Sequence, residues 1–164
     1  MDKQIAEVLS EMISRNRGDK KRIEHSLKVY GYAQLLGNLT GLTKEKRFVL
    51  ELTAILHDIG IHVSESKFGI SDGNKQEVEG PPVAREIMEN IAVNPKIVDR
   101  VCYIISKHHT FSAIDGIDFQ LLIEADFLVN AVEEGIDPEG IANFVTQNFK
   151  TESGKKLIGE LFAQ

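Results

Sequence analysis

Two side chains that can bind a metal stand next to each other in the segment ELTAILHDIG: the imidazole of His57 and the carboxylate of Asp58. Imidazole and carboxylate together suit divalent Mn, Fe, Co, Ni or Zn, and such an ion can activate water for hydrolysis. Apolar residues recur at helical spacing over residues 48–59, and Gly60 is typical of a left-handed helix stop. We therefore expect the pair at the inner end of a helix.

Two further ligand-type residues lie on apolar helix faces elsewhere in the chain. Asp126 stands in the apolar run LLIEADFLV, and His25 shares a helix row with Val29 and Leu36. A buried carboxylate must be paired, hydrogen-bonded or bound to a metal. A core ion pair, or a histidine satisfied within the core, would explain either residue alone. Three helices that each bring such a group to a buried face favour one shared site.

The elements that position these residues are predicted to be helices. The periodicity of the apolar residues gives about seven to eight helices and no strand alternation of useful length, so we expect an all-α, compact, single-domain bundle over residues 1–164. Residues 61–79 lose this periodicity and have a loop composition, which predicts a lid or entrance loop, and residues 110–118 form a second loop. Pro81 and Pro82 are predicted to start the next helix.

Composition and charge exclude several classes of protein. The chain carries a formal net charge of −6, which argues against binding to duplex nucleic acid, and its run Glu133–Glu134 is predicted to be a solvated helix face. It contains neither a long apolar run nor a signal-peptide core, so we expect a cytoplasmic protein without a membrane segment. The single cysteine, Cys102, lies in the apolar stretch VCYII and is predicted to be a buried structural thiol.

The arrangement of these residues resembles the HD-domain superfamily of metal-dependent phosphohydrolases, and most closely its small single-domain HDIG-type members. The resemblance covers residues 20–135, on which the N- and C-terminal helices would pack. The segments that carry it are RIEHSLKVYGYAQLLG with His25, AILHDIG with His57 and Asp58, EGPPVAREI, the His-His-Thr of residues 108–110, and LLIEADFLVN with Asp126.

This resemblance implies a metal site and an activity. Its first ligands would be His25, His57, Asp58 and Asp126, which would hold Mn, Fe, Co, Ni or Zn, with Mg as a further option. It implies hydrolysis of a small phosphate ester, nucleotides included, by water that the ion activates. Asp58 would also orient that water.

The number of ions depends on a second group of residues. Members of the family with two ions often have a histidine where this chain has Gln76, which is a poor ligand for a transition metal. We therefore expect one tightly held ion. A second, weaker ion is possible if Glu77 or Glu79 replaces the missing imidazole, with His109 a better ligand than His108. Otherwise these histidines are proton donors, phosphate contacts or supports of the ligands, or a packed histidine beside a loop-facing one.

Other polar residues have two interpretations each. Glu79 is either a general acid or base or a partner of a helix N-terminus. Arg22 lies one helical turn before His25, so it either binds the substrate phosphate or is a solvated charge. His62 either meets the substrate or lies on the surface, and Lys67 and Lys107 are weaker candidates for the phosphate.

Two functions from other classes stay open. The first is a metal-containing regulatory or ligand-sensing module with little turnover, which a hydrolysis assay with added metal would separate from an enzyme. The second is a structural helical protein whose buried polar groups pair with each other, which metal analysis would separate from both. The apolar C-terminal helix could also dock on a second copy of the chain and form a homo-oligomer.

Overall fold

The computed structural model describes residues 3–163, in which all regular elements are helical. This confirms the predicted all-α fold. Within these residues there are nine α-helices and one short 3-10 helix, η1. The elements are α1 (Lys3–Arg15), α2 (Lys20–Leu39), α3 (Lys44–Leu56), α4 (Ile61–Phe68), α5 (Gly73–Asn90), α6 (Pro95–Ile105), η1 (Phe111–Ala113), α7 (Ile117–Glu133), α8 (Pro138–Asn148) and α9 (Glu152–Leu161).

Most of these helices begin at a polar side chain that caps their first turn. The side chains of Asp19, Thr43, Asp72, Asn94 and Asp137 each accept a hydrogen bond from a backbone N–H of the helix that follows. Such a cap contributes about 1 kcal/mol, because it satisfies a donor that has no partner within the helix. Local sequence therefore defines where the helices begin.

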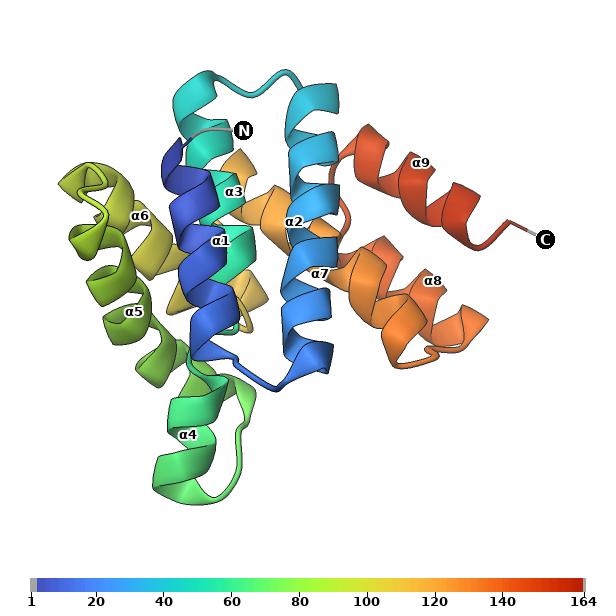
Figure 1. Cartoon of the computed structure of the whole chain (residues 1–164). Coiled ribbons are helices and arrows are strands. Elements are labelled where there is room, and N and C mark those ends of the chain that lie inside the picture. Colours follow the sequence, from blue (N-terminus) through green and yellow to red (C-terminus); the bar gives the residue numbers. More distant parts are fainter. Residues whose placement is uncertain (1–2, 164) are drawn as a thin grey trace.

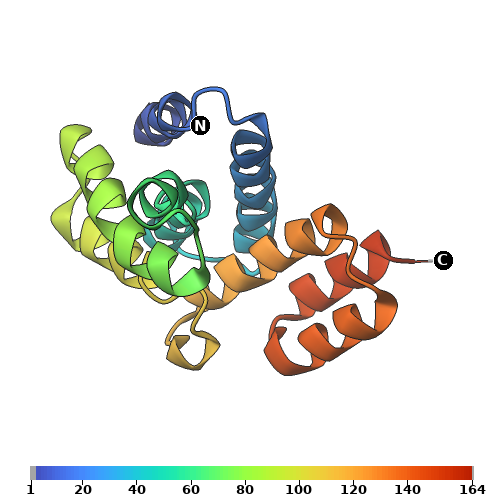
Figure 2. The same cartoon turned by 90° about the horizontal axis from the view of Figure 1, so that it is seen from below.

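Helix α3 lies at the centre of the molecule and packs against α1, α2, α6 and α7 (Figure 1). Every residue from Val49 to Leu56 is buried, so the second half of the helix is enclosed on all sides. Figure 2, seen from below, shows α3 between α2 on one side and the α5–α6 pair on the other. The chain leaves α3 at His57, whose position is thus fixed by the core.

Residues 61–79, which the sequence predicts to be a lid or entrance loop, form α4 and the beginning of α5. The prediction was wrong because the residues that give the segment its loop composition end and begin helices. Gly69 ends α4 with a φ of 74°, and Asp72 accepts a hydrogen bond from the N–H of Lys75 to start α5. This short connection between two helices replaces the predicted long loop.

Pro81 and Pro82 lie inside α5 and do not start it. Gly60 also differs from its prediction, because its φ of −80° is right-handed and it precedes α4 directly. A glycine is needed there for a different reason: a Cβ atom on Gly60 would lie 2.5 Å from the backbone nitrogen of Gly80. The turn after α3 therefore contacts the backbone of α5 directly.

The C-terminal helices α8 and α9 lie beside the far end of α7 (Figure 2). Glu124 of α7 is fully buried and holds them there. Its carboxylate accepts hydrogen bonds from the backbone N–H groups of Lys150 at 2.8 Å and Thr151 at 3.0 Å and from the amide of Gln120 at 2.9 Å. The hydroxyl of Thr151 donates a further bond. One buried carboxylate thus joins α7 to the start of α9.

The connection between α6 and α7 contains only η1 as regular structure, close to the predicted loop of residues 110–118. Arg100 of α6 holds it through Asp115 at 2.8 Å and Asp118 at 2.8 Å. Cys102 is buried as predicted, and burial raises the pKa of its thiol. No helix within residues 3–163 combines the length and the apolar character that crossing a bilayer requires.

Candidate metal centre

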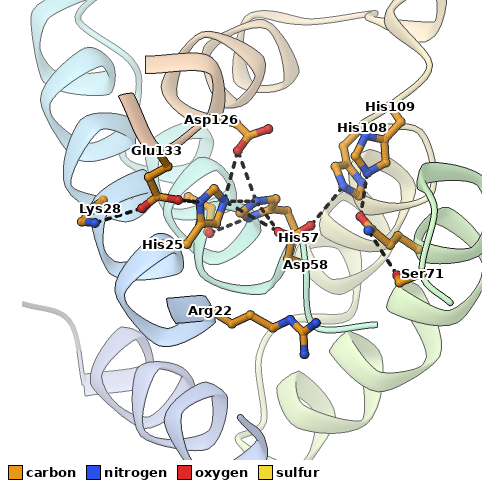
Figure 3. A network of polar contacts seen from close by, with 12 residues as sticks. Arg22, His25, Lys28, His57, Asp58, Ser71, His108, His109, Asp126 and Glu133 are labelled. Atoms are coloured by element: carbon orange, nitrogen blue, oxygen red, sulfur yellow. Dashed lines mark hydrogen bonds and ion pairs between the residues drawn. The ribbon is translucent and has the colours of Figure 1, made fainter. Parts of the chain in front are cut away.

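Four of the predicted ligands come together from three parts of the chain (Figure 3). His25 lies on α2, His57 and Asp58 lie on the turn after α3, and Asp126 lies on α7. The Nε2 atoms of the two histidines are 3.3 Å apart, and Asp126 Oδ1 lies 3.3 Å from the first and 3.5 Å from the second. Asp58 Oδ2 lies 3.7 Å and 3.6 Å from the same two nitrogens. The four donor groups face one point.

Backbone carbonyls fix the orientation of two imidazole rings. His57 Nδ1 donates to the carbonyl of Ala54 at 2.9 Å, and His108 Nδ1 donates to the carbonyl of Ile105 at 2.7 Å. Because a carbonyl only accepts, the Nδ1 atoms carry the protons. In the neutral rings both Nε2 atoms are then free to bind a metal. The carbonyls come from the last turns of α3 and α6, so each helix end orients the ring that follows it.

Glu133 orients the third ring, that of His25, and this role was not among the predictions from the sequence. His25 Nδ1 donates to Glu133 Oε2 at 2.9 Å, and Lys28 Nζ donates to Glu133 Oε1 at 2.9 Å. The side chain of Glu133 is only 16% exposed, so the predicted solvated face was wrong for this residue, whereas Glu134 is exposed. A signal for this role was available, because Glu133 follows Asp126 by seven residues and so lies on the same helix face.

The residues present fit a divalent cation. Asp126 Oδ1 and His108 Nε2 are buried and have no partner in hydrogen-bonding geometry. Buried polar atoms without a partner are costly, and a cation at this point would satisfy the carboxylate oxygen. His25, His57 and Asp58 each offer a ligand atom within 4.8 Å of the others. Two imidazoles and two carboxylates also suit transition metals chemically.

The protonation of the cluster follows from its charges. Burial opposes a charge on His57, but the carboxylates of Asp58 and Asp126 outweigh it and raise the pKa of His57 to about 9. Burial likewise opposes the charge of Asp58, but His57 and His108 lower the pKa of Asp58 to about 2. The pKa of Asp126 is lowered as well, against its burial, by His25 and His57. Without a metal, His57 is therefore an imidazolium beside two carboxylates, close to Asp126 Oδ1 but not in hydrogen-bonding geometry with it.

Asp58 also belongs to a second group of ligand-type residues, with His108 and His109. Its other oxygen, Oδ1, lies 3.7 Å from His108 Nε2. His108 is buried as predicted, and the exposed His109 donates from Nε2 to the amide oxygen of Gln76 at 2.7 Å. Although part of His109 is exposed, its ring lies against Gly73, and this desolvation together with the neighbouring His108 lowers the pKa of His109 to about 4. Gln76 thus engages the Nε2–H of His109, which leaves the lone pair of Nδ1 free.

The two glutamates that could complete a second ion site have other partners. Glu77 accepts hydrogen bonds from the backbone N–H of His109 at 3.0 Å and from the hydroxyl of Thr110 at 2.9 Å. Glu79 lies inside α5, not at a helix start, and pairs with Lys67 at 2.5 Å. The second group is therefore less complete than the first.

Arg22 faces the same cleft as the ligands. A cavity of about 300 Å³ is lined by Asp19, Lys21, Arg22, His25, Asp58, Ile61, Asn130, Glu133 and Glu134. The guanidinium of Arg22 pairs with Asp19 at 2.9 Å and Glu65 at 2.6 Å, and it lies 3.1 Å from Nδ1 of His62. Of the other predicted phosphate contacts, Lys67 is engaged with Glu79, and Lys107 is exposed.

A larger hollow of about 830 Å³, at the starts of α3 and α6, is lined by none of the predicted site residues.

The HD domain family model matches residues 22–143, which include the four converging ligands. The fold is similar to the crystal structure of a predicted HD superfamily hydrolase from an uncultured Thermotogales bacterium, with a TM-score of 0.69 at 20% sequence identity. That alignment covers 96% of this chain and 84% of the other. Comparison with curated proteins found no match. The HD domains bind divalent metals, and by the extent of the family match this chain belongs to the HD-domain family.

Proposed function

We propose that this protein is a metal-dependent phosphohydrolase that cleaves a small phosphate ester. The observation that carries the proposal is the convergence of the His25 and His57 Nε2 atoms on Asp126 Oδ1, a buried carboxylate oxygen without a hydrogen-bond donor. A structural core would satisfy that oxygen with a donor of its own. Two of the proposed ligands, His25 and Asp58, line the cleft in which a substrate would bind.

In this proposal His25, His57, Asp58 and Asp126 hold one divalent ion. Such an ion activates water and neutralises charge on the phosphoryl group. The Oδ1 atom of Asp58 lies on the side of His108, whereas Oδ2 faces the two proposed ligand histidines, so Oδ1 orients the attacking water. Arg22 binds the phosphate oxygens bidentately when it leaves Glu65.

The remaining histidines and Glu79 have smaller roles. A pKa of about 4 keeps the His109 ring neutral at pH 7, so it is a poor proton donor, and we assign it to a substrate contact or to a second ion. Glu79 is not assigned as a general base because Lys67 already neutralises it. A second ion between Asp58, His108 and His109 would bind more weakly, because Gln76 supplies no imidazole and Glu77 and Glu79 are engaged with other partners.

The proposal is tested by elemental analysis of the purified protein beside His57→Ala and Asp126→Ala. Near-stoichiometric metal in the wild type and its loss from both variants is the expected result. Replacement of the 42% exposed His62 by alanine is the matched control, which removes an imidazole near the cleft but should leave the metal content unchanged. Circular dichroism verifies that all variants are folded. Wild-type protein that holds no metal and cannot be reconstituted would refute the proposed site.

A catalytically weak regulatory module is the second candidate, and Gln76 is the observation that favours it. An amide stands beside the second group of ligand-type residues, at a position where family members with two ions often have a histidine, so this group has one imidazole fewer. Hydrolysis of p-nitrophenyl phosphate by the protein reconstituted with Mn, Co, Ni or Mg separates the two functions. Turnover that Asp58→Asn abolishes supports the enzyme. Full metal occupancy without turnover of any phosphate ester supports the module.

A further inference from the structure

We infer that the cleft selects substrates with a single phosphate and an uncharged or cationic leaving group, and that it discriminates against di- and triphosphates. This inference rests on the proposed phosphohydrolase function, because it concerns the substrate class of that site. Three features of the cleft support it: the charges that line it, the ion pairs that these charges already form, and the volume of the cavity.

Acidic side chains predominate in the lining of the cleft. Four carboxylates face two basic side chains there, and the acids are Asp19, Asp58, Glu133 and Glu134. Asp126 adds a fifth carboxylate at the ligand cluster. A divalent ion together with Lys21, Arg22 and Lys28, which pairs with Glu133, would only balance these five charges. The loaded site therefore has no surplus of positive charge with which to attract a highly charged anion.

The groups that could bind further phosphates are already occupied. Arg22 is neutralised by Asp19 at 2.9 Å and Glu65 at 2.6 Å. The N-terminus of α2 also lies at the cleft, but the carboxylate of Asp19 accepts the hydrogen bond from the backbone N–H of Arg22 at 3.1 Å. That cap replaces the anion that a free helix N-terminus would bind. Arg22 can exchange one carboxylate for one phosphate, but no second cation of this kind lines the cleft among residues 3–163 apart from Lys21.

Glu133 and Glu134 make the acidic wall on the α7 side of the cleft. Figure 3 shows Glu133 beside His25, on the opposite side of the cluster from His108 and His109. Lys28 pairs with Glu133, whereas Glu134 is exposed and retains its charge at the cleft. A polyphosphate chain that extended from the ligands along this wall would meet a carboxylate. Repulsion of this kind is how a site rejects a related ligand that would otherwise fit.

The rest of the cleft suits a leaving group without negative charge. Ile61 offers an apolar contact and Asn130 an amide, which can bind a hydroxyl group. The volume of about 300 Å³ is at the lower end of small-molecule sites. In the reaction, the oxygen of water bonds to phosphorus and the bond from phosphorus to the ester oxygen breaks. The departing oxygen keeps the electron pair and takes a proton, which gives an alcohol and inorganic phosphate.

The test compares one-phosphate and three-phosphate probes on the metal-loaded protein. Inorganic phosphate and tripolyphosphate are titrated calorimetrically, each equilibrated beforehand with the same ion so that chelation does not strip the site. Hydrolysis of a nucleoside 5′-monophosphate and of its triphosphate is measured in parallel. We expect phosphate to bind more tightly than tripolyphosphate, and the monophosphate to have at least a tenfold higher kcat/KM.

Charge reversal at the wall shows whether the acids cause this preference. Glu134→Lys is expected to improve binding of tripolyphosphate relative to phosphate by about tenfold, on the scale that one charge pair close to the site provides. The matched control is Glu45→Lys, an exposed glutamate at the start of α3, about 18 Å along the helix axis from His57 and beyond the screening length of salt. The control is expected to leave the ratio unchanged.

The outcomes distinguish the charge preference of the cleft from the phosphohydrolase function. Tripolyphosphate that binds as tightly as phosphate, or a triphosphate that is hydrolysed as fast as the monophosphate, overturns this inference and leaves the phosphohydrolase function in place. Metal-loaded protein that hydrolyses no phosphate ester overturns the proposed function, and the two titrations then still decide the charge preference. Equal effects of Glu134→Lys and Glu45→Lys would show that the wall does not cause the discrimination.

Discussion

Replacement of Glu133 by glutamine should weaken metal binding although Glu133 is not proposed as a ligand. Its carboxylate accepts from His25 Nδ1 and from Lys28 Nζ, both at 2.9 Å. A glutamine side chain has one acceptor oxygen, so it cannot accept from both partners at these positions. Either His25 faces an amide NH₂ group and loses the tautomer that frees Nε2, or Lys28 faces that group and pushes it away.

The size of the effect follows from the contact that is lost. A hydrogen bond to a charged group contributes about 1.5–3 kcal/mol, and partners of metal-binding histidines alter metal affinity by about 10- to 100-fold. The side chain of Glu133 is 16% exposed, so water can replace little of the contact. We expect a loss of metal affinity by a factor of about 10 to 100, which corresponds to about 1.4–2.7 kcal/mol.

Competition with a fluorescent chelator measures this affinity. Nitrogen-15 NMR of the metal-free protein reports the tautomer of His25 at alkaline pH, where the ring is neutral despite its raised pKa. Glu134→Gln is the matched control. Glu134 carries the same charge as Glu133 and follows it in the sequence, but its side chain is exposed. An equal loss of affinity in both variants would mean that Glu133 acts only through its long-range charge. An unchanged affinity of Glu133→Gln would refute the positioning role altogether.

Two further predictions concern stability. Glu124→Gln should lower the free energy of unfolding by about 1–2 kcal/mol in urea denaturation. The amide oxygen can still accept from the N–H groups of Lys150 and Thr151, but without the charge that strengthens these bonds, and the amide NH₂ group faces the hydroxyl that donates to Oε2. Asp118→Asn should cost about 1–2 kcal/mol at pH 7, since Arg100 outweighs burial and lowers the pKa of Asp118. Because the folded-state pKa is the lower one, this difference should be complete above about pH 4, the unfolded value, and disappear as the pH falls through the folded value.

Each stability prediction has a result that would contradict it. Glu139 on α8 is exposed, so Glu139→Gln should leave the urea midpoint nearly unchanged. If Glu124→Gln shifts the midpoint as little as this control does, the buried carboxylate does not join α7 to α9. For Asp118→Asn, a difference in stability that persists unchanged at pH 2 would show that the ion pair with Arg100 is not its cause.

The convergence of the four proposed ligands was predictable from sequence because each stands among apolar neighbours in a helical pattern. Asp126 in LLIEADFLV and His57 at the end of α3 are ionisable groups on faces that have to be buried, and such groups need partners. The pattern did not reveal what holds His25 in place. Glu133 is adjacent to the exposed Glu134 and was interpreted with it as one solvated run, although its spacing from Asp126 places it on the inner face.

Helix α4 and the start of α5 could not be predicted because local composition has two meanings there. Glycine and aspartate are typical of loops, but they also end and begin helices, as Gly69 and Asp72 do. Pro81 and Pro82 were expected to start a helix for a similar reason, yet α5 extends through both. Tertiary contacts decide these cases, such as the approach of Gly80 to Gly60, and they cannot be read from periodicity.

The contact between Gly60 and Gly80 has a consequence for engineering this protein. Because no side chain separates the turn of His57 and Asp58 from α5, main-chain atoms set the position of that turn. Substitution of Ile61, the residue of α4 that lines the cleft, should therefore reshape the cleft without moving the turn. A library built at this position, with both glycines kept, is a direct way to change substrate preference while retaining the proposed metal site.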